Sequence, residues 1–256
     1  MRFSQIAVVS FALVSAPLAA KTAAQPPANV ASAVADTASR TPDNVKLDES
    51  RKPAEVLQYL GLKRGMSAID LFGGNRYWAE IMAPVVGPRG HVLVWEPTQF
   101  TDADSKKAFA AFKAKNRNVA MVNTPFEAIS LPKNSADFVM LNLNYHDVYW
   151  ESAKYGVPKM DPQAFLKAVY AAMKPGAVIG VIDHVANPNG DTRATVDKLH
   201  RIDPDVIEAD FTKAGFKLVG TRNMLRNPAD DHSLLVFDPK IKGKTDRALF
   251  KFRKPR

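Results

Sequence analysis

The sequence has no cysteine among its 256 residues, which rules out a catalytic thiol and disulfide bonds within the chain. It also has no G-x-S-x-G motif, the turn that presents the nucleophilic serine of many hydrolases. The glycine turn after Asp70 does not have the G-x-G-x-x-G spacing of dinucleotide-dependent oxidoreductases, because the acidic residue precedes the glycines. The commonest nucleophilic and hydride-transfer enzymes are therefore poor matches.

Long apolar runs are missing after the N-terminal segment, so no later run is long enough to be a membrane span. The formal charge is +9 at pH 7, but no dense run of lysine and arginine occurs before residues 251–256. A positive charge spread in this way is typical of a soluble surface rather than of a nucleic-acid interface. We expect a small-molecule partner and no nucleic acid, whereas no pattern indicates an oligomeric state.

The N-terminus has the pattern of a secretory signal peptide. Arg2 precedes an apolar run over residues 6–14, and Pro17 and several alanines follow it. The run is too short to span a bilayer comfortably, and small residues suit a cleavage site. The sequence therefore predicts a signal peptide over residues 1–24 and an exported, periplasmic protein without a membrane span once the signal is removed.

The rest of the chain divides into two parts. Residues 25–45 contain mainly Ala, Pro, Ser, Thr and Asn with little periodic apolar content, which predicts a flexible linker. Residues 46–256 contain apolar segments that alternate with helical patterns, which predicts one α/β domain with a mostly parallel, doubly wound sheet and helices on both faces. No clear helix precedes the last strand, over residues 247–252, so we expect it to be antiparallel.

The stretch over residues 68–82 is the centre of this domain. Ile69 and Leu71 suit a buried strand, Gly73 and Gly74 a tight turn, and the residues that follow have the periodicity of a helix. Such a turn is where α/β proteins hold nucleotides, because glycines let the backbone approach a ligand and the helix N-terminus offers unpaired N–H groups. We therefore expect the ligand site there.

The order of elements, with an acidic residue ending strand one and Glu96 ending strand two, resembles the class I S-adenosylmethionine-dependent methyltransferases over residues 53–255. Shorter segments resemble an exported group of predicted methyltransferases: RKPAEVL at 51–57, NYHDVYW at 144–150, DHVA at 183–186, LHRID at 199–203, LRNPADDH at 225–232 and FDPKIKGKTDR at 237–247. The resemblance implies a Rossmann-like sheet of seven strands, six parallel and the last antiparallel, with S-adenosylmethionine as cofactor.

The resemblance also implies positions for the cofactor. Asp70 and Gly74 would lie beside its methionine part and ribose, and Glu96 would accept hydrogen bonds from the two ribose hydroxyls, for which a fixed carboxylate is well suited. Phe126 or Glu127 would lie by the adenine, and residues 142–146 would face the methyl group and the acceptor. The candidate cofactor-binding residues are Asp70, Phe72, Gly73, Gly74, Arg76, Glu96, Phe126, Glu127 and Asn142.

The turn departs from the superfamily pattern, which has glycines at the second, fourth and sixth positions after the acid. Here these positions hold Phe72, Gly74 and Arg76. Arg76 brings a cation to a turn where a positively charged sulfonium would sit, so it either turns outward, pairs with the methionine carboxylate or blocks the pocket. A second hypothesis is therefore a degenerate relative that serves as a binding protein of the cell envelope without catalysis.

The segment after strand four carries the candidate chemistry. His146, with Asp147 beside it, is the candidate base for a hydroxyl or amine acceptor, since its ordinary pKa is near working pH. Further residues that could contact a substrate are Tyr145, Tyr149, Trp150, Asp183 and His184. A third hypothesis is a metal-dependent enzyme, although the chain lacks the i, i+4 ligand spacing that makes metal sites recognisable. Its ligands would come from His146, Asp147, Asp183, His184, Asp231 and His232.

Overall fold

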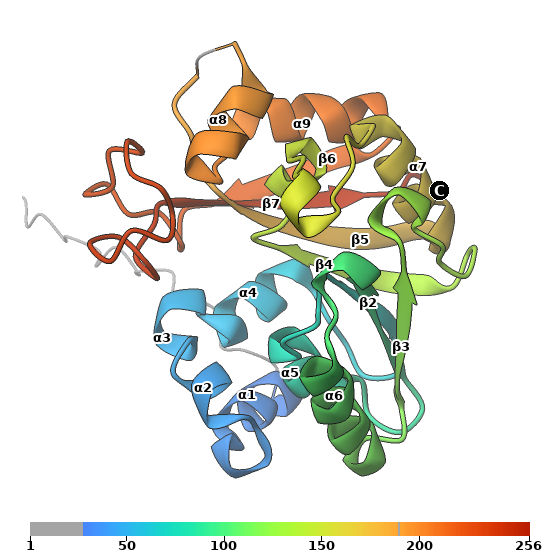
Figure 1. Cartoon of the computed structure of the whole chain (residues 1–256). Coiled ribbons are helices and arrows are strands. Elements are labelled where there is room, and N and C mark those ends of the chain that lie inside the picture. The colour runs from blue at the N-terminus through green and yellow to red at the C-terminus, as the bar shows by residue number, and fades with distance from the viewer. Residues whose placement is uncertain (1–27, 189) are drawn as a thin grey trace, which may run out of the picture.

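The computed structural model describes residues 28–188 and 190–256, so the predicted signal peptide lies outside the described residues. A seven-stranded sheet in the order β3-β2-β1-β4-β5-β7-β6 runs through the centre of the molecule (Figure 1). The strands are β1 Ser67–Leu71, β2 His91–Pro97, β3 Val119–Thr124, β4 Ala136–Asn142, β5 Met173–His184, β6 Lys217–Arg222 and β7 Arg247–Arg253. β7 pairs antiparallel with both β5 and β6, and the pairs among β1 to β5 are parallel. The predicted sheet is thereby confirmed.

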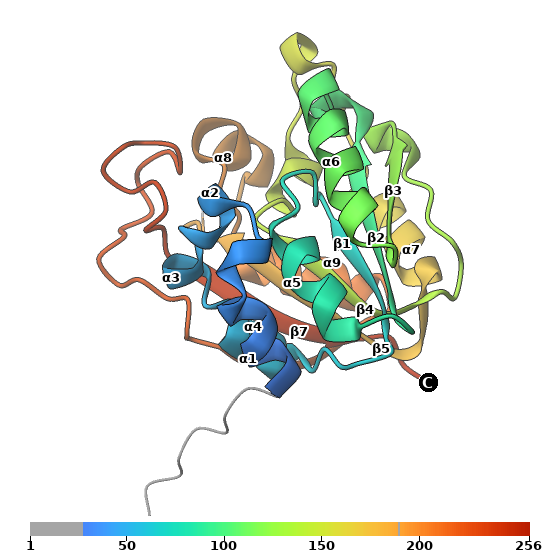
Figure 2. The same ribbon diagram turned by 90° about the horizontal axis from the view of Figure 1, so that it is seen from below.

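Helices cover both faces of the sheet, as predicted. α1, α4 and α5 lie on one face, and α7, α8 and α9 lie on the other (Figures 1 and 2). The helices are α1 Ala28–Ala35, α2 Pro42–Val45, α3 Asp48–Arg51, α4 Pro53–Leu60, α5 Tyr77–Val86, α6 Ala103–Lys115, α7 Pro162–Ala172, α8 Thr192–Leu199 and α9 Pro204–Lys213. Short 3-10 turns are η1 Thr37–Ser39, η2 Thr98–Phe100, η3 Phe126–Ala128, η4 His146–Tyr149 and η5 Ala153–Tyr155.

The period-two pattern of the strands divides the core into two clusters. In β1, Ile69 and Leu71 belong to the cluster under α7 and α9, whereas Ala68 belongs to the cluster under α4 and α5. Because successive side chains of a strand point to opposite faces, β1, β2, β4, β5 and β7 contribute buried residues to both clusters, whereas β6 is largely exposed. The ends of the parallel strands are thereby fixed between two packed layers.

The predicted linker over residues 25–45 is wrong for its described part. α1 packs against α4 and α5 through Val30 and Ala33, which are buried in the core cluster of these helices. The side chain of Asn29 donates a hydrogen bond to the carbonyl of Val85 at 3.1 Å. The composition of this segment suggested a linker because its apolar residues are mostly alanines. The burial of Val30 and Ala33 against α4 and α5 nevertheless stabilises a helix of eight residues.

Buried polar contacts fasten the same segment to α5. The carboxylate of Glu80, only 6% exposed, accepts hydrogen bonds from the backbone N–H of Thr41 at 3.1 Å and the side chain of Asn44 at 3.0 Å. Arg40 makes a two-pronged ion pair with Asp48, with nitrogen–oxygen distances of 2.6 and 2.7 Å. Residues 40–48 are thus an integral part of the wall around the turn before α5.

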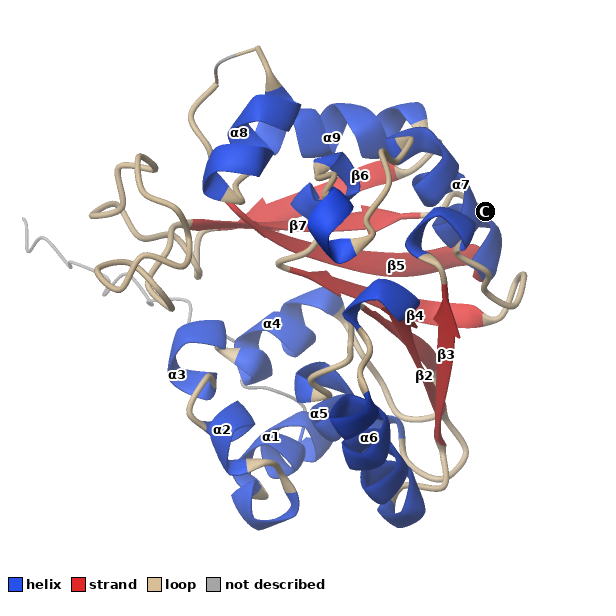
Figure 3. Ribbon diagram, in the orientation of Figure 1, coloured by secondary structure: helices blue, strands red, loops and turns tan. Residues whose placement is uncertain are grey.

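A long excursion between β6 and β7, residues 223–246, contains no regular helix or strand and extends beyond the end of the sheet as a set of loops (Figure 3). Arg201, which is fully buried, ties this excursion to the domain by a two-pronged ion pair with Asp230 at 2.8 and 3.0 Å.

Over residues 28–188 and 190–256, no helix combines the length and apolar character needed to cross a bilayer.

Candidate functional site

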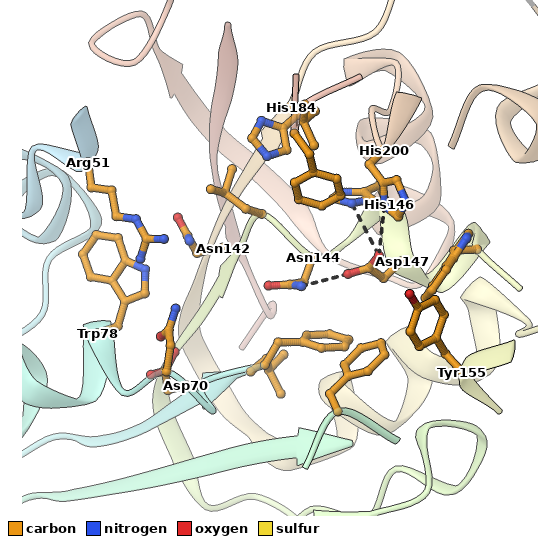
Figure 4. Close-up of a pocket in the computed structure, with 18 residues that line it drawn as sticks. Arg51, Asp70, Trp78, Asn142, Asn144, His146, Asp147, Tyr155, His184 and His200 are labelled. Atoms are coloured by element: carbon orange, nitrogen blue, oxygen red, sulfur yellow. Dashed lines mark hydrogen bonds and ion pairs between the residues drawn. The ribbon is translucent and has the colours of Figure 1, made fainter. Parts of the chain in front are cut away.

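A cavity of about 650 Å³ lies at the carboxyl ends of β1, β4 and β5. Figure 4 shows two groups of polar residues in it: Arg51, Asp70, Trp78 and Asn142 at one end, and His146, Asp147 and His200 at the other. The remaining lining residues are Leu71, Phe72, Asn75, Phe100, Leu143, Asn144, Trp150, Tyr155, His184, Val236 and Phe237. The carboxyl edge of a parallel sheet is where α/β proteins bind ligands, so this cavity is the candidate site.

The turn between β1 and α5 has no room for side chains at its glycines. Gly74 donates its backbone N–H to Glu96 Oε2 at 2.9 Å, and a Cβ on Gly74 would lie 2.6 Å from Glu96 Cδ. A Cβ on Gly73 would lie 2.6 Å from Asp70 Oδ2. The two glycines therefore let the backbone lie directly against the carboxylates that end β1 and β2.

Replacing Gly74 with alanine is expected to destabilise the protein by about 1–3 kcal/mol, because the added methyl group must displace Glu96 or the turn. Urea unfolding measures this loss. In a Glu96→Ala background the same glycine change should cost much less, since the methyl group then has space. Equal costs in the two backgrounds would show that Glu96 is not what restricts the turn.

Asp70 caps helix α5 from inside the sheet. Its Oδ2 accepts a hydrogen bond from the backbone N–H of Ala79 at 3.1 Å, and the residue is only 2% exposed. Burial raises the pKa of Asp70 to about 8, with a further rise from Glu96 and partial opposition from the Ala79 N–H and Arg51. Burial likewise raises the pKa of Glu96 to about 7, against the lowering effect of the Gly74 N–H.

The raised pKa of Asp70 predicts a pH-dependent stability. The folded state keeps the proton up to about pH 8, whereas the unfolded chain releases it near pH 3.9, so this carboxyl lowers the free energy of unfolding as pH rises between those values. Asp70→Asn keeps an oxygen for the Ala79 N–H and removes the titration. The stability of the wild type minus that of the variant should fall by up to about 1.4 kcal/mol per pH unit. A difference that is flat from pH 5 to 8 in urea titrations would contradict a protonated Asp70.

Several residues around the site have left-handed backbone conformations without being glycine. They are Phe72, Arg76, Leu143 and His200, with φ of 56°, 66°, 60° and 50°. Such conformations cost about 1–3 kcal/mol each and persist where the surrounding packing requires them. Phe72 stands where the superfamily pattern has glycine, and it keeps the backbone conformation that glycine adopts without cost. Phe72 therefore has a backbone conformation that a glycine would adopt at lower cost.

The side chain of Phe72 is part of an aromatic cluster. Its ring lies 5.0 Å from Trp95 and 5.3 Å from Phe126, both at steep edge-to-face angles, with Phe100 and Phe165 at 6.3 and 6.1 Å. Phe126 and Trp95 are fully buried. The cluster fills the space on the α7 side of β2, and among its members Phe72 and Phe100 reach the cavity.

Other predicted cofactor residues do not line the cavity. Arg76 donates to the carbonyl of Gly74 at 3.3 Å and lines a separate hollow between the N-terminal segment and α6. Glu96 is bonded to the turn, Phe126 is in the aromatic cluster, and Glu127 is exposed and accepts a hydrogen bond from Gln99 at 2.9 Å. Arg76 therefore does not occupy this cavity, and Asp70, Phe72 and Asn142 are the predicted cofactor residues that reach it.

The end of the cavity with Arg51, Asp70, Trp78 and Asn142 contains polar atoms without partners. Trp78 Nε1 and Asn142 Oδ1 are buried and make no hydrogen bond to the described protein. The guanidinium of Arg51 lies over the ring of Tyr77 at 4.3 Å from its centroid, and burial lowers the pKa of Arg51. A buried donor and a buried acceptor left unpaired cost free energy, so their presence in a cavity indicates a polar ligand.

At the other end, Asp183 holds His146 in one orientation. His146 Nδ1 lies 2.7 Å from Asp183 Oδ1, and its backbone N–H donates to Asp183 Oδ2 at 2.8 Å. Its Nε2 faces Asp147 Oδ1 at 3.4 Å. Burial alone would lower the pKa of His146, but Asp183 and Asp147 beside it raise that pKa to about 9. The two neighbouring carboxylates thus favour the protonated imidazole, and His146 as the base for an acceptor stays a prediction.

His200 and His184 complete this end of the cavity. His200 Nδ1 lies 3.8 Å from Asp147 Oδ1, and Asn144 donates to Asp147 Oδ2 at 2.8 Å. His184 Nδ1 lies 2.7 Å from Thr245 Oγ1, and burial lowers the pKa of His184 well below its usual value, so its imidazole is neutral. The sequence did not single out His200, because it follows a helix 54 positions after His146 and only the fold brings the two together.

The predicted substrate residues divide into two groups. Trp150 and His184 line the cavity, and Asp183 lies directly behind His146. Tyr145 and Tyr149 instead donate their hydroxyl groups to Asp210 and do not line the cavity. The mouth instead carries Tyr155 and Phe237, which are 54% and 57% exposed. Of the predicted metal ligands, Asp231 and His232 lie outside the cavity, in the excursion before β7.

No family model matches the chain. Over 136 residues, 53% of the chain, it is 25% identical to the demethylmenaquinone methyltransferases of Listeria welshimeri and Listeria monocytogenes. It spans about half the length of these curated relatives, 51%. The crystal structure of a SAM-dependent methyltransferase from Aquifex aeolicus superposes with a TM-score of 0.57 at 18% identity, covering 84% of this chain and 94% of that one. The chain has the fold of the class I methyltransferases.

This methyltransferase fold does not by itself fix a reaction. The crystal structure of the [4+2]-cyclase SpnF superposes with the same TM-score of 0.57, at 14% identity and over 80% of each chain. One fold commonly supports several chemistries, and function depends on the residues of the site. The activity of the present chain therefore has to be argued from its cavity.

Proposed function

We propose that the protein transfers a methyl group from S-adenosylmethionine to a small molecule. The observation that supports this most directly is the cavity at the carboxyl ends of β1, β4 and β5, with unpaired polar atoms at one end and aromatic and histidine side chains at the other. Methyl transfer is an in-line displacement, so the enzyme must hold donor and acceptor at two ends of one continuous space.

The end with Arg51, Asp70, Trp78 and Asn142 suits the methionine part of the cofactor. Its carboxylate would accept hydrogen bonds from Trp78 Nε1 and the Arg51 guanidinium, and its ammonium group would donate to Asn142 Oδ1. These contacts would satisfy both unpaired buried atoms at once. Residues of β1, α5 and β4 would then share one ligand.

The end near the mouth suits a flat acceptor. Trp150 and Tyr155 lie 5.7 Å apart between ring centroids, and Phe237 approaches from the excursion before β7. The Listeria relatives are named for methyl transfer to demethylmenaquinone. We therefore propose an aromatic small molecule as the acceptor, with its polar group toward His146, Asp147 and His184.

Calorimetric titration of the purified protein with S-adenosylmethionine and S-adenosylhomocysteine tests the cofactor. We expect binding, accompanied by a rise in the melting temperature. Trp78→Phe keeps the ring and removes the N–H, which should weaken binding by about 1.5–3 kcal/mol, or roughly 10- to 150-fold. Trp150→Phe, the matched change at the acceptor end, should leave cofactor affinity unchanged. Absence of heat and of thermal stabilisation at millimolar cofactor would overturn the proposal.

A second candidate, a binding protein that keeps the fold without methyl transfer, is favoured by one observation. Glu96, the predicted ribose ligand, is bonded to the Gly74 N–H and does not line the cavity. If Glu96 nevertheless binds the ribose, Glu96→Ala should weaken cofactor binding by about 1.5–3 kcal/mol for each hydrogen bond lost. Unchanged affinity would refute the ribose contact, whereas absence of cofactor binding by the wild-type protein would favour the second candidate.

We also propose that the protein is exported. The support is the sequence pattern of the first 24 residues, with Arg2, the apolar run over residues 6–14 and the alanines after Pro17. Fractionation of cells that produce the full chain should recover a shortened protein in the periplasm. Recovery of the full-length chain in the cytosol would contradict export.

A further inference from the structure

We propose that His146, Asp147 and His200 bind a divalent first-row transition-metal ion at the inner end of the cavity. One ligand atom of each residue lies within 4.8 Å of the other two. His146 Nε2 and Asp147 Oδ1 are 3.4 Å apart, and His200 Nδ1 and Asp147 Oδ1 are 3.8 Å apart. Two ligands bound at about 2.1 Å to a tetrahedral metal lie about 3.4 Å from each other, so the spacing needs only small side-chain movements.

Neighbouring residues already orient two of these ligands as a metal requires. Asp183 binds His146 Nδ1 and leaves Nε2 directed at Asp147, the arrangement in which a carboxylate fixes the tautomer of a metal-binding imidazole. Asn144 holds the second oxygen of Asp147 at 2.8 Å and leaves Oδ1 for the ion. Asp183 is fully buried, so this orientation is fixed by the fold rather than by the solvent.

The ligand set indicates the class of ion. Two imidazoles and one carboxylate suit Zn²⁺, Fe²⁺ or Mn²⁺, whereas Mg²⁺ and Ca²⁺ prefer oxygen ligands throughout. Three protein ligands also leave coordination positions open, as in catalytic rather than structural zinc sites. All three residues line the cavity, so an ion there would face a bound molecule, where it could lower the pKa of an acceptor hydroxyl group.

The remaining described histidine that pairs with a buried carboxylate provides a control. His232 Nε2 lies 3.0 Å from Asp246 Oδ2, but the pair lies outside the cavity and its Nδ1 is bonded to Asn187. It resembles the His146–Asp147 pair in composition but lacks a third ligand in the described chain. His232→Ala therefore removes a histidine–carboxylate pair without touching the proposed site.

Titration of the chelator-treated, untagged full chain with Co²⁺ tests the proposal, with visible absorption and calorimetry as readouts. We expect one Co²⁺ per chain and absorption bands of a low-symmetry site with nitrogen and oxygen ligands. His200→Ala and Asp147→Asn should lower the affinity by about 100-fold or more, and Asp183→Asn by about 10- to 100-fold. His232→Ala should bind like the wild type.

Circular dichroism and the melting temperature of the metal-free protein identify variants that fail to fold. If His200→Ala fails to fold, His200→Gln is used in its place. Two results would overturn the proposal: a wild-type protein that binds neither Co²⁺ nor Zn²⁺ at millimolar concentration, or a folded His200 variant with wild-type Co²⁺ affinity. Either result would leave a hydrogen-bonded histidine–carboxylate network. Metal binding does not depend on methyl transfer, so this test and the cofactor titration can fail independently.

Discussion

Asp230→Asn is expected to lower the free energy of unfolding by about 3–5 kcal/mol, because it leaves the buried guanidinium of Arg201 without its counter-charge. Both side chains are almost completely buried, at 0% and 2% exposure. Asp230 also accepts hydrogen bonds from the backbone N–H groups of His232 and Asp246. The change therefore also weakens the loop between these two residues. Equilibrium unfolding in urea measures the loss.

The exposed pair Asp43–Lys46 is the matched control for this change. Asp43→Asn should leave the unfolding curve unchanged, because solvent screens an exposed ion pair. Asp230→Asn should also weaken acceptor binding. The reason is that Arg201 holds the excursion before β7, and this excursion places Val236 and Phe237 at the cavity. A stability loss below 1 kcal/mol would show that Arg201 finds another partner or water.

Phe126→Ala is expected to destabilise the protein by about 3–5 kcal/mol, the cost of a large cavity in a packed core. Phe126 is fully buried, and its ring lies 5.3 to 6.2 Å from those of Phe72, Trp95, Phe100 and Phe165. Phe237→Ala is the matched control, since this ring is 57% exposed and its loss should change stability by no more than about 0.5 kcal/mol.

Variants of the same two residues distinguish packing in the core from contact with a ligand. Phe126→Leu, which preserves most of the volume, should leave the affinity for S-adenosylmethionine nearly unchanged if the ring only packs. A large loss of affinity for S-adenosylmethionine in this variant, with little loss of stability, would support the predicted contact between Phe126 and the adenine. Phe237→Ala should have the opposite profile, with normal stability and weaker acceptor binding.

The sheet could be predicted from the sequence because its signals are local. Ile69 and Leu71 before a pair of glycines, and apolar segments separated by helical patterns, indicate parallel strands and crossover helices wherever they occur. The antiparallel β7 followed from the lack of a helix before it. Long-range packing has no such signature, which is why residues 28–45 were predicted as a linker although Val30 is fully buried.

The candidate site could be predicted only in part, for the same physical reason. Asp70, Asn142 and His146 follow or end predicted strands, and the ends of parallel strands meet at one edge. His200 and Phe237 reach the cavity from a helix end and a long loop, and their positions depend on how the chain returns to the sheet. The direction of a side chain also depends on residues far away in the sequence. Tyr145 is adjacent to His146, but its hydroxyl group donates a hydrogen bond to Asp210.

The position of β7 has a consequence for the synthesis of the protein. This strand is the last of the seven strands of the sheet along the chain, and it pairs with β5 on one side and β6 on the other. A chain that has not yet completed β7 therefore exposes two unpaired strand edges, which are sites of intermolecular pairing. A protease-shortened or prematurely terminated chain lacking residues 247–253 should accumulate as aggregates, and a chaperone that covers strand edges should be needed until β7 has paired with both neighbours.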